Sequence, residues 1–164
     1  MARIILLSII ACFLLSCNTK SNVEPATAPV SVTLVVINTD AIAASLKDKG
    51  YQIWLEETED TIYILQQYYL VLLKDGPHRD QDSTTTARLQ EGHMAHLNRM
   101  HKEGYADLIG PMGTNEENAR GIVVYNVPTA QVADSLAKLD PMVQAGRLKV
   151  VTLPWWTAKY GTLR

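Results

Sequence analysis

Cysteine is scarce in this chain of 164 residues: there are two, Cys12 and Cys17, both within the first seventeen positions. The remainder therefore has no thiol for a disulfide, a thiolate metal site or a cysteine nucleophile. An excess of one charge is also missing, since 15 Lys and Arg stand against 17 Asp and Glu, a net charge of -2. Without a basic stripe, nucleic acid is not an expected partner.

Several catalytic signatures are absent too. The sequence has no phosphate-binding glycine loop, no nucleophile elbow and no H-E-x-x-H zinc helix. We therefore expect no metal and no cofactor, and chemistry limited to acid–base work by His and Asp, or none. The composition and the length suit one folded domain, because 47% of the residues are apolar and 164 residues is an ordinary length for a single domain.

The first residues have the pattern of a targeting signal. Arg3 is the only charge before Lys20, and an apolar run of about a dozen residues, too short for a membrane span, follows it. The run ends in Leu14-Leu15-Ser16-Cys17, which resembles the bacterial lipobox, in which the cysteine is lipidated and begins the mature chain. An ordinary signal peptide or a buried N-terminal helix is the alternative. We predict a signal over residues 1–16, lipid on Cys17, a flexible tether over 17–29, and anchoring to a membrane of the bacterial cell envelope, at the outer membrane or facing the periplasm.

Two regions follow the tether. Residues 30–67 are predicted to form a strand (30–38), a short helix begun by Asp40 and a hairpin, which together make an N-terminal extension. Residues 68–161 give the order strand, helix, strand, strand, helix, strand, the last strand spanning 147–153. This order predicts an α+β fold of the ferredoxin-like, split βαβ type, with an antiparallel sheet that buries one face under two helices.

His93 stands out within the helix predicted to run from Asp82 or Ser83 to about Lys102. At about 100° per residue, it lies at the centre of an apolar stripe that faces the sheet. A titratable group directed into a core is costly unless it has a partner. A core histidine bonded to a backbone carbonyl is the simpler interpretation. His93-x-x-His96 has a spacing that can hold a metal, but no cysteine or paired acid lies nearby in sequence, so no metal site is expected.

Asp140 is the second candidate. It follows a predicted helix and precedes Pro141, so it can be the N-cap of a new short turn that Gly146 ends. Capping needs no catalysis, yet one carboxylate oxygen can cap while the other orients an imidazole. Arg120 and Arg147 begin predicted strands and are candidates for holding an anion, although solvation explains most such arginines.

Several ordered segments resemble the YciI-like, or YCII-related, family from Tyr68 to about Gly161. The spacing of 17 residues from His93 to Gly110-Pro111 is similar to that of the family histidine. The other matching segments begin at Tyr69, Gly92, Arg120, Asp140 and Pro154 and read YLVLLKDGP, GHMAHL, RGI, DPMVQAG and PWWTAK. The resemblance implies a ferredoxin-like fold paired into a dimeric α/β barrel, and a pocket centred on a histidine and an aspartate, here His93 and Asp140. The N-terminal extension and the lipobox depart from the family pattern.

Two functions are compatible with these residues. In the first, the chain is a lipid-anchored enzyme, with His93 as general acid or base and Asp140 orienting its ring. The reaction is proton transfer, isomerisation or elimination on a small, cyclic or aromatic molecule. Tyr69, Met112, Arg120 and Trp155 are the candidate substrate-binding residues, although closure of the sheet end or of a dimer seam is the preferred role for Trp155-Trp156. In the second, the chain is a non-catalytic module that binds a small ligand or a protein of the envelope. A homodimer is the expected assembly of the chain.

Overall fold

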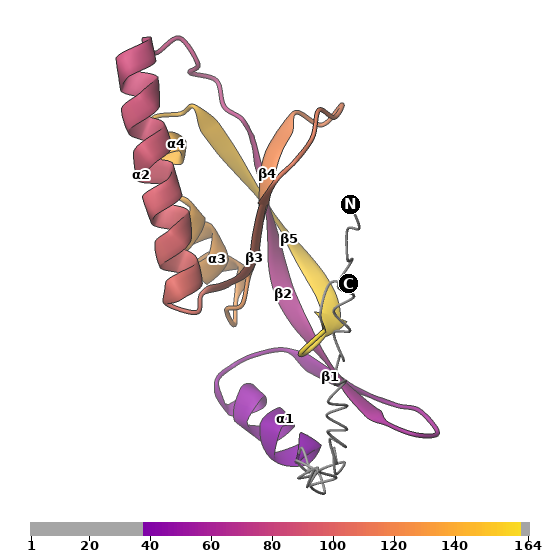
Figure 1. The fold of residues 1–164 in the computed structure, drawn as a ribbon. Helices are drawn as coiled ribbons and strands as arrows, with labels where there is room; N and C mark the ends of the chain where they lie inside the picture. Colours follow the sequence, from indigo (N-terminus) through magenta and orange to yellow (C-terminus); the bar gives the residue numbers. More distant parts are fainter. Residues whose placement is uncertain (1–37, 162–164) are drawn as a thin grey trace, which may run out of the picture. The chain divides into compact units, whose positions relative to one another are not determined.

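The computed structural model describes residues 38–161. The predicted signal, Cys17, the tether and the strand at 30–38 lie outside the described residues, except for Asn38. No helix within the described part of the chain is both long enough and apolar enough to span a membrane. The elements in chain order are α1 Thr39–Asp48, β1 Ile53–Glu57, β2 Ile62–Asp75, α2 Ser83–Lys102, β3 Ala106–Pro111, β4 Ala119–Tyr125, α3 Ala130–Ala137, α4 Pro141–Gln144 and β5 Leu148–Ala158 (Figure 1).

The long strand β2 is the centre of one antiparallel sheet. It pairs with β5 along one side over Leu65–Asp75, and with β4 on its other side, while β3 pairs with β4. The strand order β5-β2-β4-β3, with all neighbours antiparallel, is that of the split βαβ arrangement. The α+β, ferredoxin-like fold class predicted from the sequence is therefore confirmed.

The N-terminal part adds to this sheet. Strand β1 forms a hairpin with the first half of β2, from Ile53 opposite Gln66 to Glu57 opposite Ile62. The predicted boundary between the N-terminal extension and the domain, at residues 67 and 68, falls inside β2, which is one continuous strand from Ile62 to Asp75. Helix α1 is capped by Asn38 and not by Asp40, which lies in the first turn.

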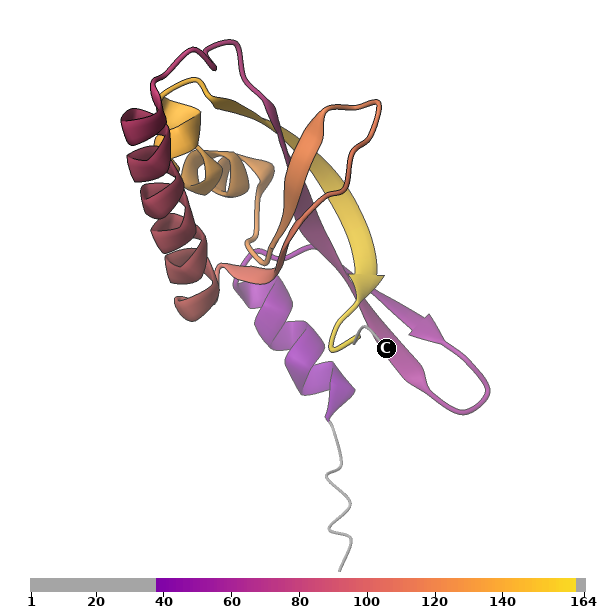
Figure 2. The ribbon, with the colours of Figure 1, turned by 45° about the horizontal axis from the view of Figure 1, so that its top comes forward.

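The helices α2, α3 and α4 lie on one side of the sheet, as the two views show (Figures 1 and 2). Side chains alternate across a strand, so every second residue of β2 points toward these helices. Tyr69, Val71 and Leu73 do so, and they pack with Leu97 and Met100 of α2 in the buried core. The alternate residues Leu70 and Leu72 are partly exposed on the opposite face.

Strand β5 is longer than the sequence predicted, since it continues past Leu153 to Ala158. Pairing with β2 persists through Pro154 opposite Tyr69 and Trp155 opposite Tyr68. Proline is tolerated here because β5 is an edge strand, so that no second neighbour needs its N–H. The Trp155-Trp156 pair is thus part of the sheet.

Candidate functional site

The structure brings together the two residues that the sequence predicted at the site. His93 Nδ1 lies 2.5 Å from Asp140 Oδ2, and both side chains are buried. The other carboxylate oxygen, Oδ1, accepts the backbone N–H of Met142 at 2.8 Å and so caps helix α4. Both contacts that the sequence allowed for Asp140 are made at once.

This double contact fixes the imidazole. A carboxylate oxygen only accepts hydrogen bonds, so the proton of the neutral ring belongs on Nδ1, where it is donated to Asp140. The Nε2 atom then carries the lone pair and makes no hydrogen bond to the described part of the chain. The arrangement presents one basic nitrogen with a fixed orientation, which is what a general base requires.

A cavity of about 740 Å³ borders His93. It lies between helix α2 and the strands β3 and β4, with the start of β5 at one end, and its size is within the range of small-molecule sites. The wall is mostly apolar with a few polar groups. The lining residues are Leu73, Arg79, Thr86, Gln90, His93, Met94, Leu97, Asn98, His101, Asp107, Leu108, Ile109, Gly110, Pro111, Arg120, Gly121, Ile122, Met142, Arg147 and Leu148.

Arg120 is the one predicted substrate-binding residue in this wall. Its Nε and Nη2 groups donate to the two oxygens of Asp75 at 2.9 and 2.5 Å. Hydrogen bonding from Arg120, with the charge of Arg79 adding to it, lowers the pKa of Asp75 below its ordinary value. Arg79 and Arg147 also line the cavity. The sequence indicated Arg147 but not Arg79, because a single arginine in an irregular connection forms no recognisable pattern.

The other three predicted contact residues do not line this cavity. Tyr69 points into the core, where its hydroxyl lies 3.2 Å from Gln67 Oε1. Met112 follows the end of β3 and is exposed. Trp155 lies opposite Tyr68 across the β2–β5 pair, with ring centroids 6.5 Å apart. Tyr69 lies on the same face of β2 as the lining residue Leu73 but four residues away from it along the strand. Met112 lies beyond the end of β3, and strand alternation turns Trp155 to the face away from the helices.

The neighbouring histidines have separate environments. His96 is buried, and burial lowers its pKa below the ordinary value, against the opposing charge of Asp140. His101 lines the cavity, and its Nδ1 lies 3.0 Å from the carbonyl oxygen of Ala106. Among the described residues, no group of three or more His, Cys, Asp and Glu side chains is placed to hold a metal ion.

The fold and the site together define a class: a ferredoxin-like α+β domain with a buried His–Asp pair beside a mainly apolar cavity. The sequence profile of the YCII-related domain matches residues 67–157. Because this match spans more than half of the chain, the protein belongs to the YCII-related family. The predicted family resemblance is thereby confirmed.

Comparison with solved structures adds to the family match. The chain is similar to 5-chloro-2-hydroxyhydroquinone dehydrochlorinase (TftG) from Burkholderia phenoliruptrix, solved in complex with 2,5-dihydroxybenzoquinone. The two share 19% sequence identity with a TM-score of 0.39, over 57% of this chain and 95% of the other. No curated protein matches the chain.

Proposed function

We propose that this YCII-related protein is a small acid–base enzyme in which His93 moves the proton. The observation that carries the proposal is the contact of His93 Nδ1 with Asp140, which leaves Nε2 as the basic atom of a residue lining the cavity. Nε2 takes a proton from a carbon or hydroxyl of the bound molecule. In a proton transfer or an isomerisation the ring returns the proton to another atom of that molecule. In an elimination the leaving group departs with the electron pair of its bond, and the ring gives the proton to that group or to solvent. The reaction class is proton transfer, isomerisation or elimination on a small, cyclic or aromatic molecule, and no cofactor takes part.

Exchange of carbon-bound protons with solvent tests the proposal without knowledge of the physiological substrate. A panel of cyclic ketones, lactones and ring carboxylic acids is incubated with the full chain in D₂O, and loss of each proton signal is followed by NMR. Removal of a general base typically costs about 10²–10⁴-fold. His93→Gln should lose the enzyme-dependent exchange to that extent.

His101→Gln is the matched control, because His101 lines the same cavity but its Nδ1 contacts the carbonyl oxygen of Ala106 and not a carboxylate, so its ring lacks the charged partner that the proposal requires. It should retain exchange within a few-fold of the wild type, and both variants are checked for folding by thermal unfolding. Exchange that survives in His93→Gln contradicts the proposal. A folded wild-type protein that exchanges no member of the panel favours the second function, a non-catalytic ligand-binding module.

We further propose that the protein acts as a homodimer joined through the open face of its sheet. Val151, Leu153 and Trp155 alternate along β5 on the face away from the helices, and each is at least 37% exposed. They lie opposite Leu72, Leu70 and Tyr68 of β2, so the face is apolar across both strands. A contiguous exposed apolar face is typical of an interface.

Sedimentation velocity tests this pairing with two charge insertions. Leu153→Glu should convert the dimer to a monomer, because it places a charge within the apolar face. Val132→Glu on α3 is the control, since Val132 is similarly exposed, at 39%, but belongs to the helical layer. A wild-type monomer, or a Leu153→Glu dimer, contradicts the proposal.

The lipid anchor on Cys17 and the envelope location are proposed on the lipobox resemblance of Leu14-Leu15-Ser16-Cys17. Expression in a bacterium fed an alkyne-bearing fatty acid tests them directly. The wild type and the control Cys12→Ser should carry label and sediment with membranes. Cys17→Ser should do neither, and labelling of Cys17→Ser contradicts the anchor.

A further inference from the structure

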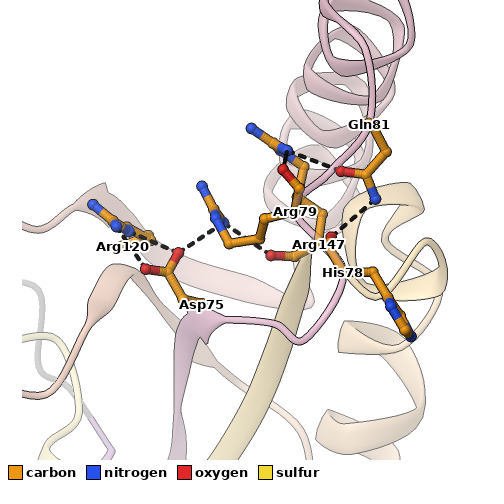
Figure 3. A network of polar contacts seen from close by, with 6 residues as sticks. All are labelled: Asp75, His78, Arg79, Gln81, Arg120 and Arg147. Carbon is orange, nitrogen blue, oxygen red and sulfur yellow. Dashed lines mark hydrogen bonds and ion pairs between the residues drawn. The ribbon is translucent and has the colours of Figure 1, made fainter.

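Three arginines reach the cavity from three different parts of the chain. Arg79 lies in the connection between β2 and α2, Arg120 is on β4, and Arg147 immediately precedes β5. Figure 3 shows Asp75 between Arg120 and Arg79, with Arg147 beside them. The end of β2 brings these side chains together, because its two neighbours β4 and β5 both begin beside it.

The arginines outnumber the carboxylates that neutralise them. Asp75 accepts from Arg120 and forms an ion pair with Arg79 at 2.7 Å, but Asp75 itself does not line the cavity. Arg147 donates to neutral acceptors, namely Gln81 Oε1 at 2.9 Å and the carbonyl oxygen of Arg79 at 3.4 Å. Among the described residues it has no carboxylate partner. The cavity therefore has three guanidinium groups among its lining residues, whereas Asp75, which pairs with two of them, is not a lining residue.

Asp107 is the other charged group in the wall. Its carboxylate oxygens lie 3.2 and 3.4 Å from the Asn126 side-chain amide. At the arginine end of the cavity, three guanidinium groups stand against the one carboxylate of Asp75, because Asp107 contacts Asn126 and Asp140 contacts His93. Asp107 lies near the start of β3, where β3 pairs with Tyr125 at the end of β4, whereas Arg120 lies at the beginning of β4.

The arginine cluster is also held in place before any ligand arrives. Gly76 N–H donates to the Arg147 carbonyl at 3.0 Å, and Arg79 Nη1 donates to the same oxygen at 3.0 Å. The Arg147 guanidinium is itself held by Gln81 Oε1 at 2.9 Å. A planar guanidinium that is already held loses little conformational freedom on binding, and its geometry suits the two oxygens of a carboxylate. The flexible ammonium group of a lysine would be neither held in place in this way nor matched to the two oxygens of a carboxylate.

We propose that the cavity binds a small organic carboxylate, whose anionic group lies on the arginine cluster and whose apolar body lies along the wall toward His93. Leu73, Leu97 and Leu148 supply apolar surface in that wall. This assignment deepens the proposed function. The part that rests on the proposed function is the position of the reacting carbon: the carbon that loses or gains a proton is the one held at His93 Nε2. Binding of the carboxylate itself does not depend on catalysis.

Isothermal titration of the full chain with benzoate and with its neutral isostere benzamide tests the assignment. Benzoate should bind at least about tenfold more tightly than benzamide, and its affinity should fall as salt is raised. Arg147→Met should weaken the binding of benzoate at least about tenfold, and so abolish the preference, while the affinity for benzamide stays the same. Lys149→Met is the matched control, because Lys149 is an exposed cation two residues further along that does not line the cavity.

The outcomes separate this inference from the proposed function. Arginine-dependent benzoate binding in the wild type, together with loss of proton exchange in His93→Gln, supports both. Arginine-dependent benzoate binding without any proton exchange supports the carboxylate site and contradicts the enzyme. Equal binding of benzoate and benzamide, or unchanged preference in Arg147→Met, overturns the carboxylate site whatever the exchange result. If Arg147→Met does not fold, Arg120→Met replaces it. Displacement of benzoate by inorganic phosphate at similar concentration also overturns the assignment to an organic carboxylate.

Discussion

Gly92 lies directly against the ring of Pro141. A Cβ atom built on Gly92 would be 3.0 Å from Pro141 Cγ, closer than carbon atoms pack without displacement. These residues precede His93 and follow Asp140, so the absence of a side chain at position 92 permits the approach of α2 and α4 that brings the pair together. A glycine inside a helix is normally a liability of about 0.5–1 kcal/mol, and here the packing explains it.

Gly92→Val should separate the two helices. Overpacking of this kind costs about 1–3 kcal/mol, and the displacement should lengthen the contact of His93 with Asp140. Urea unfolding measures the first effect, and the ring ¹⁵N shifts of His93 measure the second. Glu91→Val is the control, because Glu91 is exposed on the same helix and valine is a poor helix former there too. Equal destabilisation by both substitutions would show that the Gly92–Pro141 approach is not required.

Asp140→Asn should keep the helix cap and change the tautomer of His93. Asparagine caps as well as aspartate, so its oxygen can accept the Met142 N–H while its amide group faces His93 Nδ1. The ring nitrogen then accepts, and the proton moves to Nε2. Two-dimensional ¹H–¹⁵N spectra of the imidazole distinguish the two tautomers.

Asp140→Ala provides the comparison, since it should also lose about 0.5–2 kcal/mol from the missing cap. The asparagine variant should lose proton exchange with little loss of stability. A tautomer unchanged by Asp140→Asn would mean that Asp140 does not hold the ring.

His96 should make the protein less stable in mild acid. Burial lowers its pKa in the folded state, whereas the unfolded chain has an ordinary value of about 6.5. Below that pH the unfolded state binds more protons than the folded state, so stability is lost as the pH falls. The limiting contribution of one such group is about 1.4 kcal/mol per pH unit.

Urea unfolding at pH 7.5 and 5.5 measures this dependence. His96→Leu should reduce the difference between the two pH values, because it removes the buried imidazole. The exposed His78→Gln should keep the wild-type dependence. An unchanged slope in His96→Leu would assign the acid sensitivity to other groups.

Gly76→Ala should be among the most destabilising single substitutions in the domain. A Cβ atom at Gly76 would lie 2.1 Å from the Gly146 carbonyl oxygen, and backbone cannot yield as a flexible side chain does. We expect a loss of at least about 3 kcal/mol, together with loss of the benzoate preference, since Gly76 also donates to the Arg147 carbonyl. Thermal unfolding checks the stability.

Gly113→Ala is the control for this prediction. No atom lies within 4 Å of its built Cβ, so the change should alter stability by no more than about 1 kcal/mol. Similar melting temperatures for Gly76→Ala and the wild type would show that the two backbone segments can move apart.

The sequence by itself determined the order of the elements and singled out His93 and Asp140 as candidates, whereas their pairing was what the family resemblance implied. The position of His93 follows from helical periodicity, which depends only on neighbours three and four residues away. The cap at Asp140 follows from the residue type beside Pro141, which is again a local property. Local rules of this kind can be read from a single sequence, and the structure places both side chains in contact as they allowed.

Only the tertiary structure decided which other residues share the cavity. Trp155 faces away from the helices because the β2–β5 register puts it opposite Tyr68, and a shift of one residue would have reversed its direction. Arg79 and Arg147 are 68 residues apart and meet because Gly76 and Gly146 allow two backbone segments to touch. Register and close approach depend on the whole sheet, so no local pattern in the sequence could reveal the arginine cluster.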